Sequence, residues 1–341
     1  MSLSSPPADR QKGSAYPKLW LIAAIIASLL VSQFVHLNPY FSIVVINIGI
    51  NIILAVSLNL VNGYTGQFSL GHAGFMAIGA YSAAAVTSFG GARWFDSLGG
   101  VNNATTTSLF IVALTIGGLA AALAGLIVGV PSLRLKGDYL AIATLGFGEI
   151  IRVIIQNTET MGGSRGFSVS GIYTTIFWTY TVAAITVYVV VNLVNSAYGR
   201  GFLTVRDDEI AAEAIGVNTT KYKVVAFVLA SFFAGIAGGL YAHFIGYLTP
   251  EGFGFMKSIE IIVMVILGGM GNTVGVIFAA VLLTILPEVL RPVQEYRMVI
   301  YSLMLIILML TRPQGLFGGI TWRRPAWLRK KRTPVEDGNP A

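Results

Sequence analysis

Apolar stretches separated by short polar segments fill most of this chain. A helix that spans a lipid bilayer needs about 20 consecutive, mainly apolar residues, and most of the stretches approach that length. The pattern predicts ten spanning helices, at residues 19–35, 40–61, 67–89, 108–130, 139–156, 175–194, 224–248, 258–269, 273–290 and 296–311. We therefore expect an all-α, polytopic integral membrane protein whose transmembrane domain covers residues 19–311.

The first and the eighth stretches each allow a second interpretation. Residues 19–35 could be the apolar core of a signal peptide, but no small-residue cleavage site follows them, which favours an anchoring helix. Residues 258–269 are short for a full crossing. They could instead form half of a broken helix, which a membrane protein tolerates only where the break is buried in protein or lines a cavity.

The composition agrees with a membrane protein and removes several classes of chemistry. Hydrophobic residues make up 55% of the chain and charged residues 11%, whereas a soluble domain carries about 25% charged residues. The chain has no cysteine, which excludes disulfides, thiol catalysis and cysteine metal sites. His36, His72 and His243 lie far apart, without metal-ligand spacing. We expect no metal site, no cofactor and no catalytic residues.

The distribution of basic residues predicts the orientation in the membrane. The formal net charge of +7 does not indicate a nucleic-acid partner, because the lysines and arginines lie at helix ends and in the tails. With both termini in the cytoplasm, 16 basic residues fall on the cytoplasmic side and 5 on the opposite side, in agreement with the positive-inside rule. Residues 1–18 then form a disordered cytoplasmic tail and residues 312–341 a basic one.

Residues 196–223 form the one long cytoplasmic loop of this arrangement. Asp207 or Asp208 can cap a helix whose first turn carries Glu209, which is favoured at the positive end of the helix dipole. Alanines follow, and Gly216 is a natural helix end. The loop therefore predicts a short amphipathic helix between basic flanks. This helix either rests on lipid headgroups or docks a soluble partner.

Part of this loop resembles the docking loop of ABC importer permeases, which inserts into a cleft on the ATPase. The shared pattern is Ala-Ala-x-x-x-Gly at 211–216, but the acidic residue stands at Glu209, one place earlier than in the general pattern. Five further segments resemble permeases of branched-chain amino acid importers, in particular the LivM-type subunit. They are GQFSLGHAGFMAIGAY (66–81), LRLKGDYLAIATLGFGEIIR (133–152), GGSRG (162–166), LGGMGNTVG (267–275) and TRPQGLFG (311–318).

The resemblance implies a ten-helix permease in the bacterial inner membrane that moves branched-chain amino acids. Its implied partners are a sister LivH-type permease, two ABC ATPase subunits and a periplasmic substrate-binding protein. The chain has no Gly-Lys dipeptide and therefore no P-loop, so ATP hydrolysis is expected on separate chains. The resemblance assigns ATPase docking to Arg206, Glu209, Ala211, Ala212, Gly216 and Lys221.

Glycine-rich segments inside the predicted spans have two interpretations. Glycines at 71, 74 and 79 could let neighbouring helices approach closely. Alternatively, glycines at 63, 66 and 71 interrupt the helix and expose backbone groups to a central pathway, which Gln67, Ser69 and His72 would then face. Ser69 and His72 do not predict a hydrolase, because the G-x-S-x-G pattern is missing and no acid lies nearby.

Ionisable residues inside the spans complete the candidate pathway. Glu149 and Arg152 are three residues apart, so they share a helix face and can neutralise each other. An ionisable residue within a span costs about 2.5–3.5 kcal/mol on insertion scales, which favours a function for it. The pair is either a structural ion pair or a substrate contact. Glu260 is a second candidate for a buried acid on the pathway.

Two alternatives stay open from the sequence. A permease for urea, amides or sugars would look similar, because the binding protein on another chain sets the specificity. A stand-alone, ion-coupled secondary transporter would show two comparable halves and paired acids at the membrane midplane. We find no convincing internal repeat, and that class leaves the docking-type loop unexplained.

Overall fold

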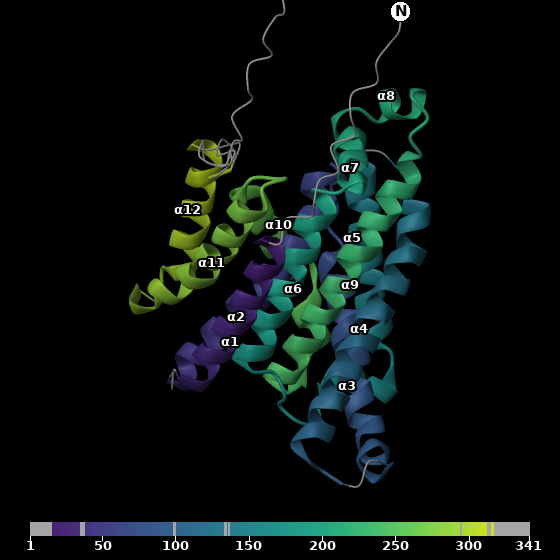
Figure 1. Ribbon diagram of the computed structural model, residues 1–341. Coiled ribbons are helices and arrows are strands. Elements are labelled where there is room, and N and C mark those ends of the chain that lie inside the picture. The colour runs from purple at the N-terminus through teal and green to yellow at the C-terminus, as the bar shows by residue number, and fades with distance from the viewer. Residues whose placement is uncertain are drawn as a thin grey trace, which may run out of the picture.

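The computed structural model describes residues 16–34, 38–97, 100–132, 135, 137–293, 295–311 and 315–316. Most of the two predicted tails, 1–18 and 312–341, lies outside the described residues, as do Arg134 and Lys136 of the predicted cytoplasmic side. The described part is built almost entirely of helices (Figure 1). The predicted all-α class is therefore confirmed.

Each predicted apolar stretch contains a helix. The helices are α1 (Tyr16–Phe34), α2 (Pro39–Asn59), α3 (His72–Ser97), α4 (Asn103–Ser132), α5 (Asp138–Gln156), α6 (Ile176–Val194), α7 (Ala197–Asp207), α8 (Glu209–Ala214), α9 (Thr219–Ile245), α10 (Phe255–Gly268), α11 (Thr273–Val289) and α12 (Arg297–Thr311). One π-helix, η1 (Leu60–Tyr64), and the short 3₁₀ turns η2 (Glu159–Met161), η3 (Gly163–Arg165), η4 (Pro250–Phe253) and η5 (Arg291–Val293) join them. The strands β1 (Phe167–Ser168) and β2 (Tyr247–Leu248) form one short antiparallel pair.

Five of the described helices are long and apolar enough to cross a bilayer. They are Pro39–Tyr64, His72–Asp96, Asn103–Ser132, Ile176–Val194 and Thr219–Ile245. Shorter apolar helices, including Leu21–Leu30 and Thr273–Val289, accompany them. The protein is thus a multi-pass membrane protein, and the number of ten crossings stays a prediction.

The tightest packing joins α3, α4 and α9. Gly79 of α3 lies against the backbone of Gly235 in α9, and Gly117 of α4 lies against Gly79, so closely that a Cβ atom at any of the three would overlap a neighbour. Gly71 and Gly74 meet α5 in the same way. Lipid tails are as apolar as leucine, so helices in a bilayer associate through close packing that small residues allow. The prediction that these glycines permit close approach is confirmed.

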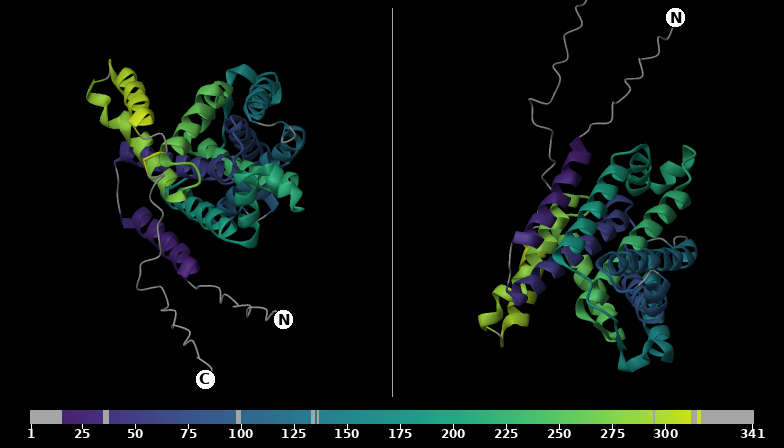
Figure 2. Two further views of the ribbon diagram at one scale, coloured as in Figure 1. Left: turned by 90° about the horizontal axis from the view of Figure 1, so that it is seen from above. Right: turned by 60° about the horizontal axis from the view of Figure 1, so that its bottom comes forward.

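α2 lies at the centre of the molecule. Its second half is buried on every side, with Ile53, Leu54 and Leu58 fully enclosed, as expected of a helix that is apolar all round. Seen from above, α3, α4 and α5 gather on one side of it and α11 and α12 on the other (Figure 2). Asn51 of α2 donates a hydrogen bond to Thr284 of α11, with 2.9 Å between Nδ2 and Oγ1. α12 packs on α11 at the edge of the molecule.

Candidate functional site

A partly buried break in the helix separates α2 from α3. α2 continues into the π-helix η1, the next residues are not helical, and α3 begins only at His72. Gly66 has a φ of +68°, a conformation that side chains with a Cβ rarely adopt. The predicted span 67–89 therefore began five residues too early. Residues 65–71 are not helical, because Gly66 has a positive φ and side chains bind their backbone groups.

Side chains replace the missing helical hydrogen bonds of this break. The Asn62 amide accepts from the Ser69 N–H at 3.2 Å and donates to the Ser69 carbonyl at 3.5 Å. The Leu70 N–H donates to Oγ1 of Thr144 in α5 at 3.0 Å, and the Gln67 N–H donates to the Val61 carbonyl at 3.1 Å. Backbone groups buried away from water must be paired in this way. Asn62 and Thr144 thus support the break, and neither was among the site residues predicted from the sequence.

Gln67, Ser69 and His72, the predicted pathway residues, all lie in or next to the break and are 4%, 2% and 3% exposed. His72 Nε2 lies 2.9 Å from Oγ of Ser57 in α2, so its described hydroxyl partner is Ser57 and not Ser69. Neither polar atom of the Gln67 amide has a hydrogen-bond partner among the described residues, and the same is true of Asn59 Nδ2. Polar atoms in this state are rare in folded proteins, which marks the break as a site for a further polar group.

A second glycine turn, between α10 and α11, meets this break. Gly269 and Gly271 have φ values of +94° and +82°. The Gly271 N–H donates to Oδ1 of Asn59 at 2.9 Å, and the Tyr64 hydroxyl lies 2.8 Å from Oγ1 of Thr273. Two turns that are far apart in sequence are therefore joined by hydrogen bonds.

The ionisable residues of the predicted pathway are paired. Glu149 Oε2 and Arg152 Nε lie 2.7 Å apart, which confirms the predicted i,i+3 pair, and their side chains are 35% and 27% exposed. Glu260 pairs with Lys257 at 3.0 Å. Its side chain is 39% exposed, so the description of Glu260 as a buried acid was wrong. Glu260 lies in the second turn of α10 and is partly exposed beside Lys257.

Loop 196–223 contains two helices, α7 and α8, where the sequence predicted one. Asp208 separates them and caps α8, because its Oδ1 accepts from the N–H groups of Ile210 and Ala211 at 2.9 and 3.0 Å. Gly216 follows the end of α8 with a φ of +84°. The predicted cap and stop are confirmed. The additional helix α7 is stabilised by the burial of Phe202 and Val205, which are 0% and 4% exposed.

α8 has an inner and an outer face. On the inner face, Ala212 is fully buried and Glu209 forms an ion pair with Lys223 of α9 at 2.6 Å. On the outer face, Ala211 is exposed, and Ile210 and Ile215 are 73% and 75% exposed. Neither isoleucine was among the docking residues predicted from the sequence. A sequence signal for them exists. Both are bulky aliphatic residues in a charged loop, and they stand next to the two ends of a predicted helix.

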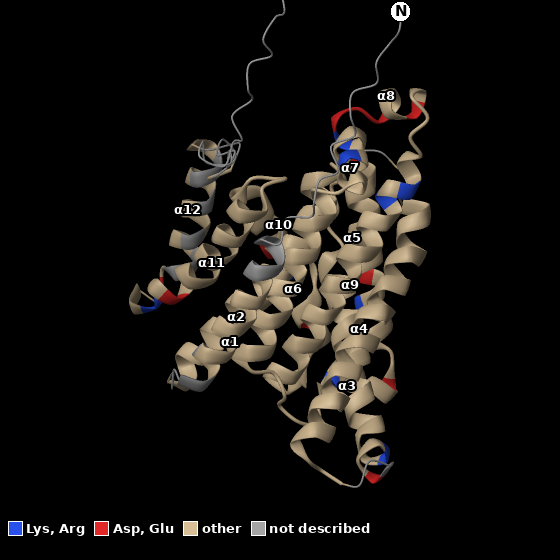
Figure 3. Ribbon diagram, viewed as in Figure 1, with Lys and Arg blue, Asp and Glu red and all other residues tan. Residues whose placement is uncertain are grey.

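Charged groups gather around this loop. Arg206 and Lys221 are both exposed, and Figure 3 shows basic residues at α7 and at the start of α9, with acidic residues next to α8. Arg206 pairs with its neighbour Asp207 at 3.0 Å.

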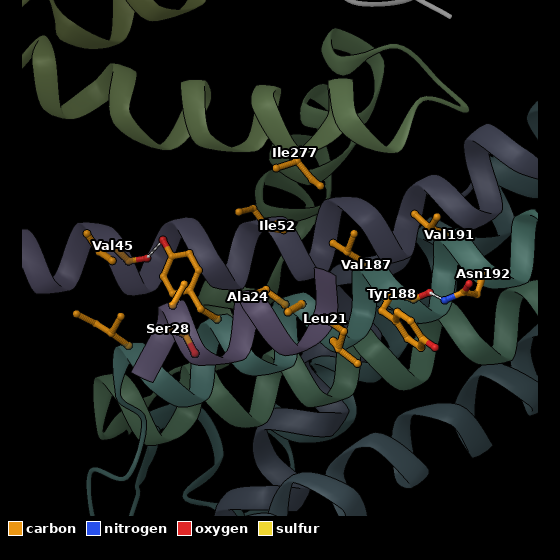
Figure 4. A pocket seen from close by; sticks show the side chains of 15 residues that line it. Leu21, Ala24, Ser28, Val45, Ile52, Val187, Tyr188, Val191, Asn192 and Ile277 are labelled. Atoms are coloured by element: carbon orange, nitrogen blue, oxygen red, sulfur yellow. Dashed lines mark hydrogen bonds between the residues drawn. The ribbon is translucent and has the colours of Figure 1, made fainter. Parts of the chain in front are cut away.

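A separate apolar cavity of about 730 Å³ lies between α1, α2 and α6, with Ile277 of α11 at its border (Figure 4). Its few polar groups include Ser28, Tyr180 and Asn192, and the Tyr180 hydroxyl already donates to the Val45 carbonyl at 3.1 Å. Among the described residues, no charged residue lines it, nor does any residue of the predicted pathway. The lining suits hydrocarbon and not the charged head of an amino acid.

Comparison with known proteins gives one consistent result. The family described as the permease component of the branched-chain amino acid transport system matches residues 40–309. The high-affinity branched-chain amino acid permease proteins LivM of Salmonella typhimurium and of Escherichia coli are each 37% identical over 302 residues, which cover 78% of this chain and 67% of theirs. The permease protein LivH of Escherichia coli is 29% identical over 164 residues, covering 46% of this chain and 52% of its own. No solved structure matches the chain.

Proposed function

Because this chain belongs to the family of branched-chain amino acid transport permeases, we propose that it is a LivM-type membrane subunit of an ATP-driven importer for branched-chain amino acids. The observation that carries the proposal is the capped α8 helix, which presents Ile210 and Ile215 outward from a charged loop. Exposed aliphatic side chains rimmed by polar residues are typical of a protein interaction site.

The proposed partner at α8 is an ABC ATPase. The chain has no P-loop of its own, so the energy of ATP hydrolysis reaches it through a contact. Ala211, Ile210 and Ile215 form the contacting face in this proposal. Glu209 and Ala212 hold α8 against its own chain and Gly216 ends it, while the positive charges of Arg206 and Lys221 lie at its border.

The complete importer in this proposal has further subunits. A sister permease of the LivH type pairs with this chain, two ATPases bind on the cytoplasmic side, and a periplasmic protein delivers the substrate. The excess of basic residues on the side of loop 196–223 supports a cytoplasmic position for that loop and for both termini. The membrane is then the bacterial inner membrane.

The proposed pathway passes the break between α2 and α3. Gln67 supports this, because its amide is buried without a partner among the described residues and can bind a passing polar group. Ser69 and His72 flank it. Glu149 and Glu260 are proposed to line the route farther along, each with its charge balanced by a basic neighbour.

A second candidate substrate class is a small polar solute other than an amino acid. The Autoinducer 2 import system permease protein LsrC of Yersinia pseudotuberculosis is 27% identical over 189 residues, which cover 53% of each chain. The lower identity and the shorter match favour the amino acid class.

Reconstituted transport tests the proposal. The chain, a LivH-type permease, the two ATPases and the binding protein of one operon would be placed in liposomes. We expect ATP-dependent uptake of labelled leucine, isoleucine or valine, and none when the ATPases are omitted. Uptake of autoinducer 2 or urea without any uptake of these amino acids would contradict the substrate class.

A further inference from the structure

Arg206, near the end of α7, lies between two glycine turns of the membrane domain. A Cβ atom placed on Gly66 would lie 2.9 Å from Cγ of Arg206, and a Cβ atom placed on Gly271 would lie 3.2 Å from its Nη1. The aliphatic part of the side chain thus rests on the α2–α3 break, while the guanidinium reaches the α10–α11 turn. Its other nitrogens, Nε and Nη2, bind Asp207 at 3.1 and 3.0 Å.

The C-terminal segment joins the same cluster. Gly315 lies against Gly269, and the Leu316 N–H donates to the Leu267 carbonyl at 2.7 Å. Segments around residues 66, 270 and 315 are therefore held together, although they are far apart in sequence. Arg206 contacts two of these three segments, and it does so from the loop that carries α8.

Both turns contacted by Arg206 are linked to the buried part of the molecule. Gly271 bonds the side chain of Asn59, the last residue of α2, and Tyr64 of η1 bonds Thr273 at the start of α11. A π-helix is rare and is frequently found at functional sites. A displacement of Arg206 would therefore press on the ends of α2, α10 and α11 together.

α7 is packed firmly against α9. Phe202 is fully buried and packs edge-on against Tyr222 of α9, with ring centroids 5.9 Å apart. α8 follows α7 after a single residue, Asp208. Arg206 therefore lies at the junction of the two helices, where a movement of α8 would reach it first.

We propose that Arg206 is a positioning residue that couples movement of α7 and α8 to the two glycine turns beside the candidate pathway. This inference rests on the proposed function, and it gives Arg206 a role within the chain in place of direct contact with the ATPase. The alternatives are that Arg206 binds the ATPase directly or only stabilises the fold.

The test compares Arg206→Ala with Arg200→Ala in the complete importer. Arg200 is also an exposed arginine of α7 and serves as the matched control. Three quantities are measured for each: the amount of ATPase that co-purifies, the melting temperature, and the number of substrate molecules imported per ATP hydrolysed. We expect Arg206→Ala to lower the number of substrate molecules imported per ATP about tenfold. The amount of co-purifying ATPase and the melting temperature should not change. Arg200→Ala should leave all three unchanged.

A conservative variant separates coupling from folding. Arg206→Lys keeps the aliphatic stem beside Gly66 and the positive charge, so it should recover most of the lost import per ATP. If Arg206→Ala does not fold, Arg206→Met, which keeps the stem alone, takes its place with the same expected loss.

Several results would overturn the inference. Normal import per ATP in Arg206→Ala would show that the contact transmits nothing, and loss of co-purifying ATPase would make Arg206 a docking residue. A lower melting temperature with import per ATP unchanged would make its role structural. Absence of ATP-driven uptake in the unmodified importer would instead contradict the proposed function, and the inference with it.

Discussion

Glu209, the first residue of α8, forms an ion pair with Lys223 of α9, with 2.6 Å between Oε1 and Nζ. The Lys223 side chain is 8% exposed and that of Glu209 25%, so the pair ties the inner face of α8 to the membrane domain. The position of the acidic residue one place early in the loop is therefore explained. The Glu209 side chain points inward to Lys223, whereas the Ile210 side chain at the next position points outward and is exposed.

Removal of one partner of this pair should destabilise the protein. Glu209→Gln leaves the Lys223 ammonium buried without a counter-charge, which we expect to cost about 1–3 kcal/mol of the free energy of unfolding. Thermal unfolding in detergent measures it. Glu213→Gln is the control, because the amide oxygen can still accept from the Thr219 hydroxyl. The double variant Glu209→Gln with Lys223→Met should recover most of the loss, and equal stability of all variants would contradict the explanation.

Ile210 and Ile215 should decide the affinity for the ATPase. We expect Ile210→Asp and Ile215→Asp each to weaken binding about tenfold, which corresponds to ~1.4 kcal/mol, because each places a charge in an apolar contact. Titration of the purified permease with the ATPase measures this. Val101, which is 71% exposed in the connection between α3 and α4, supplies the control Val101→Asp. Unchanged affinity in both isoleucine variants would exclude α8 as the docking face.

Two glycines of α3 should respond in opposite ways to the same substitution. At Gly79 an added methyl group overlaps the backbone of Gly235, so Gly79→Ala should destabilise the protein by about 1–3 kcal/mol or more. At Gly90 nothing lies within 4 Å of the added atom, so Gly90→Ala should stabilise it by about 0.5–1 kcal/mol. Unfolding of the two variants in one detergent compares them. A loss at both positions would show that helix packing is not the cause.

The pair of Glu149 and Arg152 can be separated into a structural and a transport role. Arg152→Leu leaves the carboxylate without its partner and should lower the folded yield in the membrane. Replacing both residues by leucine should restore the yield, because a partly buried ion pair contributes little net stability. Uptake by the double variant then decides the role. Full uptake by the double variant indicates a structural pair, and loss of uptake places Glu149 on the pathway. Full yield of the single variant Arg152→Leu would contradict the need of Glu149 for a partner.

Membrane topology follows from the charge distribution. Reporter fusions after Lys221 and after Arg312 should give cytoplasmic signals, and a fusion within 157–174 should give a periplasmic one. The chain contains no cysteine, so single-cysteine variants at the same places offer an independent measurement with a membrane-impermeant label. A periplasmic signal at Lys221 would contradict both the orientation and the ATPase contact.

The sequence by itself determined the membrane class, the helical content and the capped helix of the loop 196–223, because these depend on neighbouring residues. Apolar runs set the helices, Asp208 can reach only the first N–H groups of α8, and an i,i+3 pair such as Glu149 and Arg152 meets on any helix. The match of six short motifs also identified the family. None of these features required knowledge of which helices touch.

Only the tertiary structure decided what each polar residue does. His72 could have paired with Ser69 by spacing, but the packing of α3 on α2 brings Ser57 to its ring. Glu260 was expected to be buried, yet it is partly exposed and pairs with Lys257 of the preceding turn. Arg206 and Gly271 are far apart in the chain and meet only because α7 packs over the two glycine turns. Hydrophobic periodicity fixes which face of a helix is apolar, whereas the partner of that face depends on how all the helices fill space together.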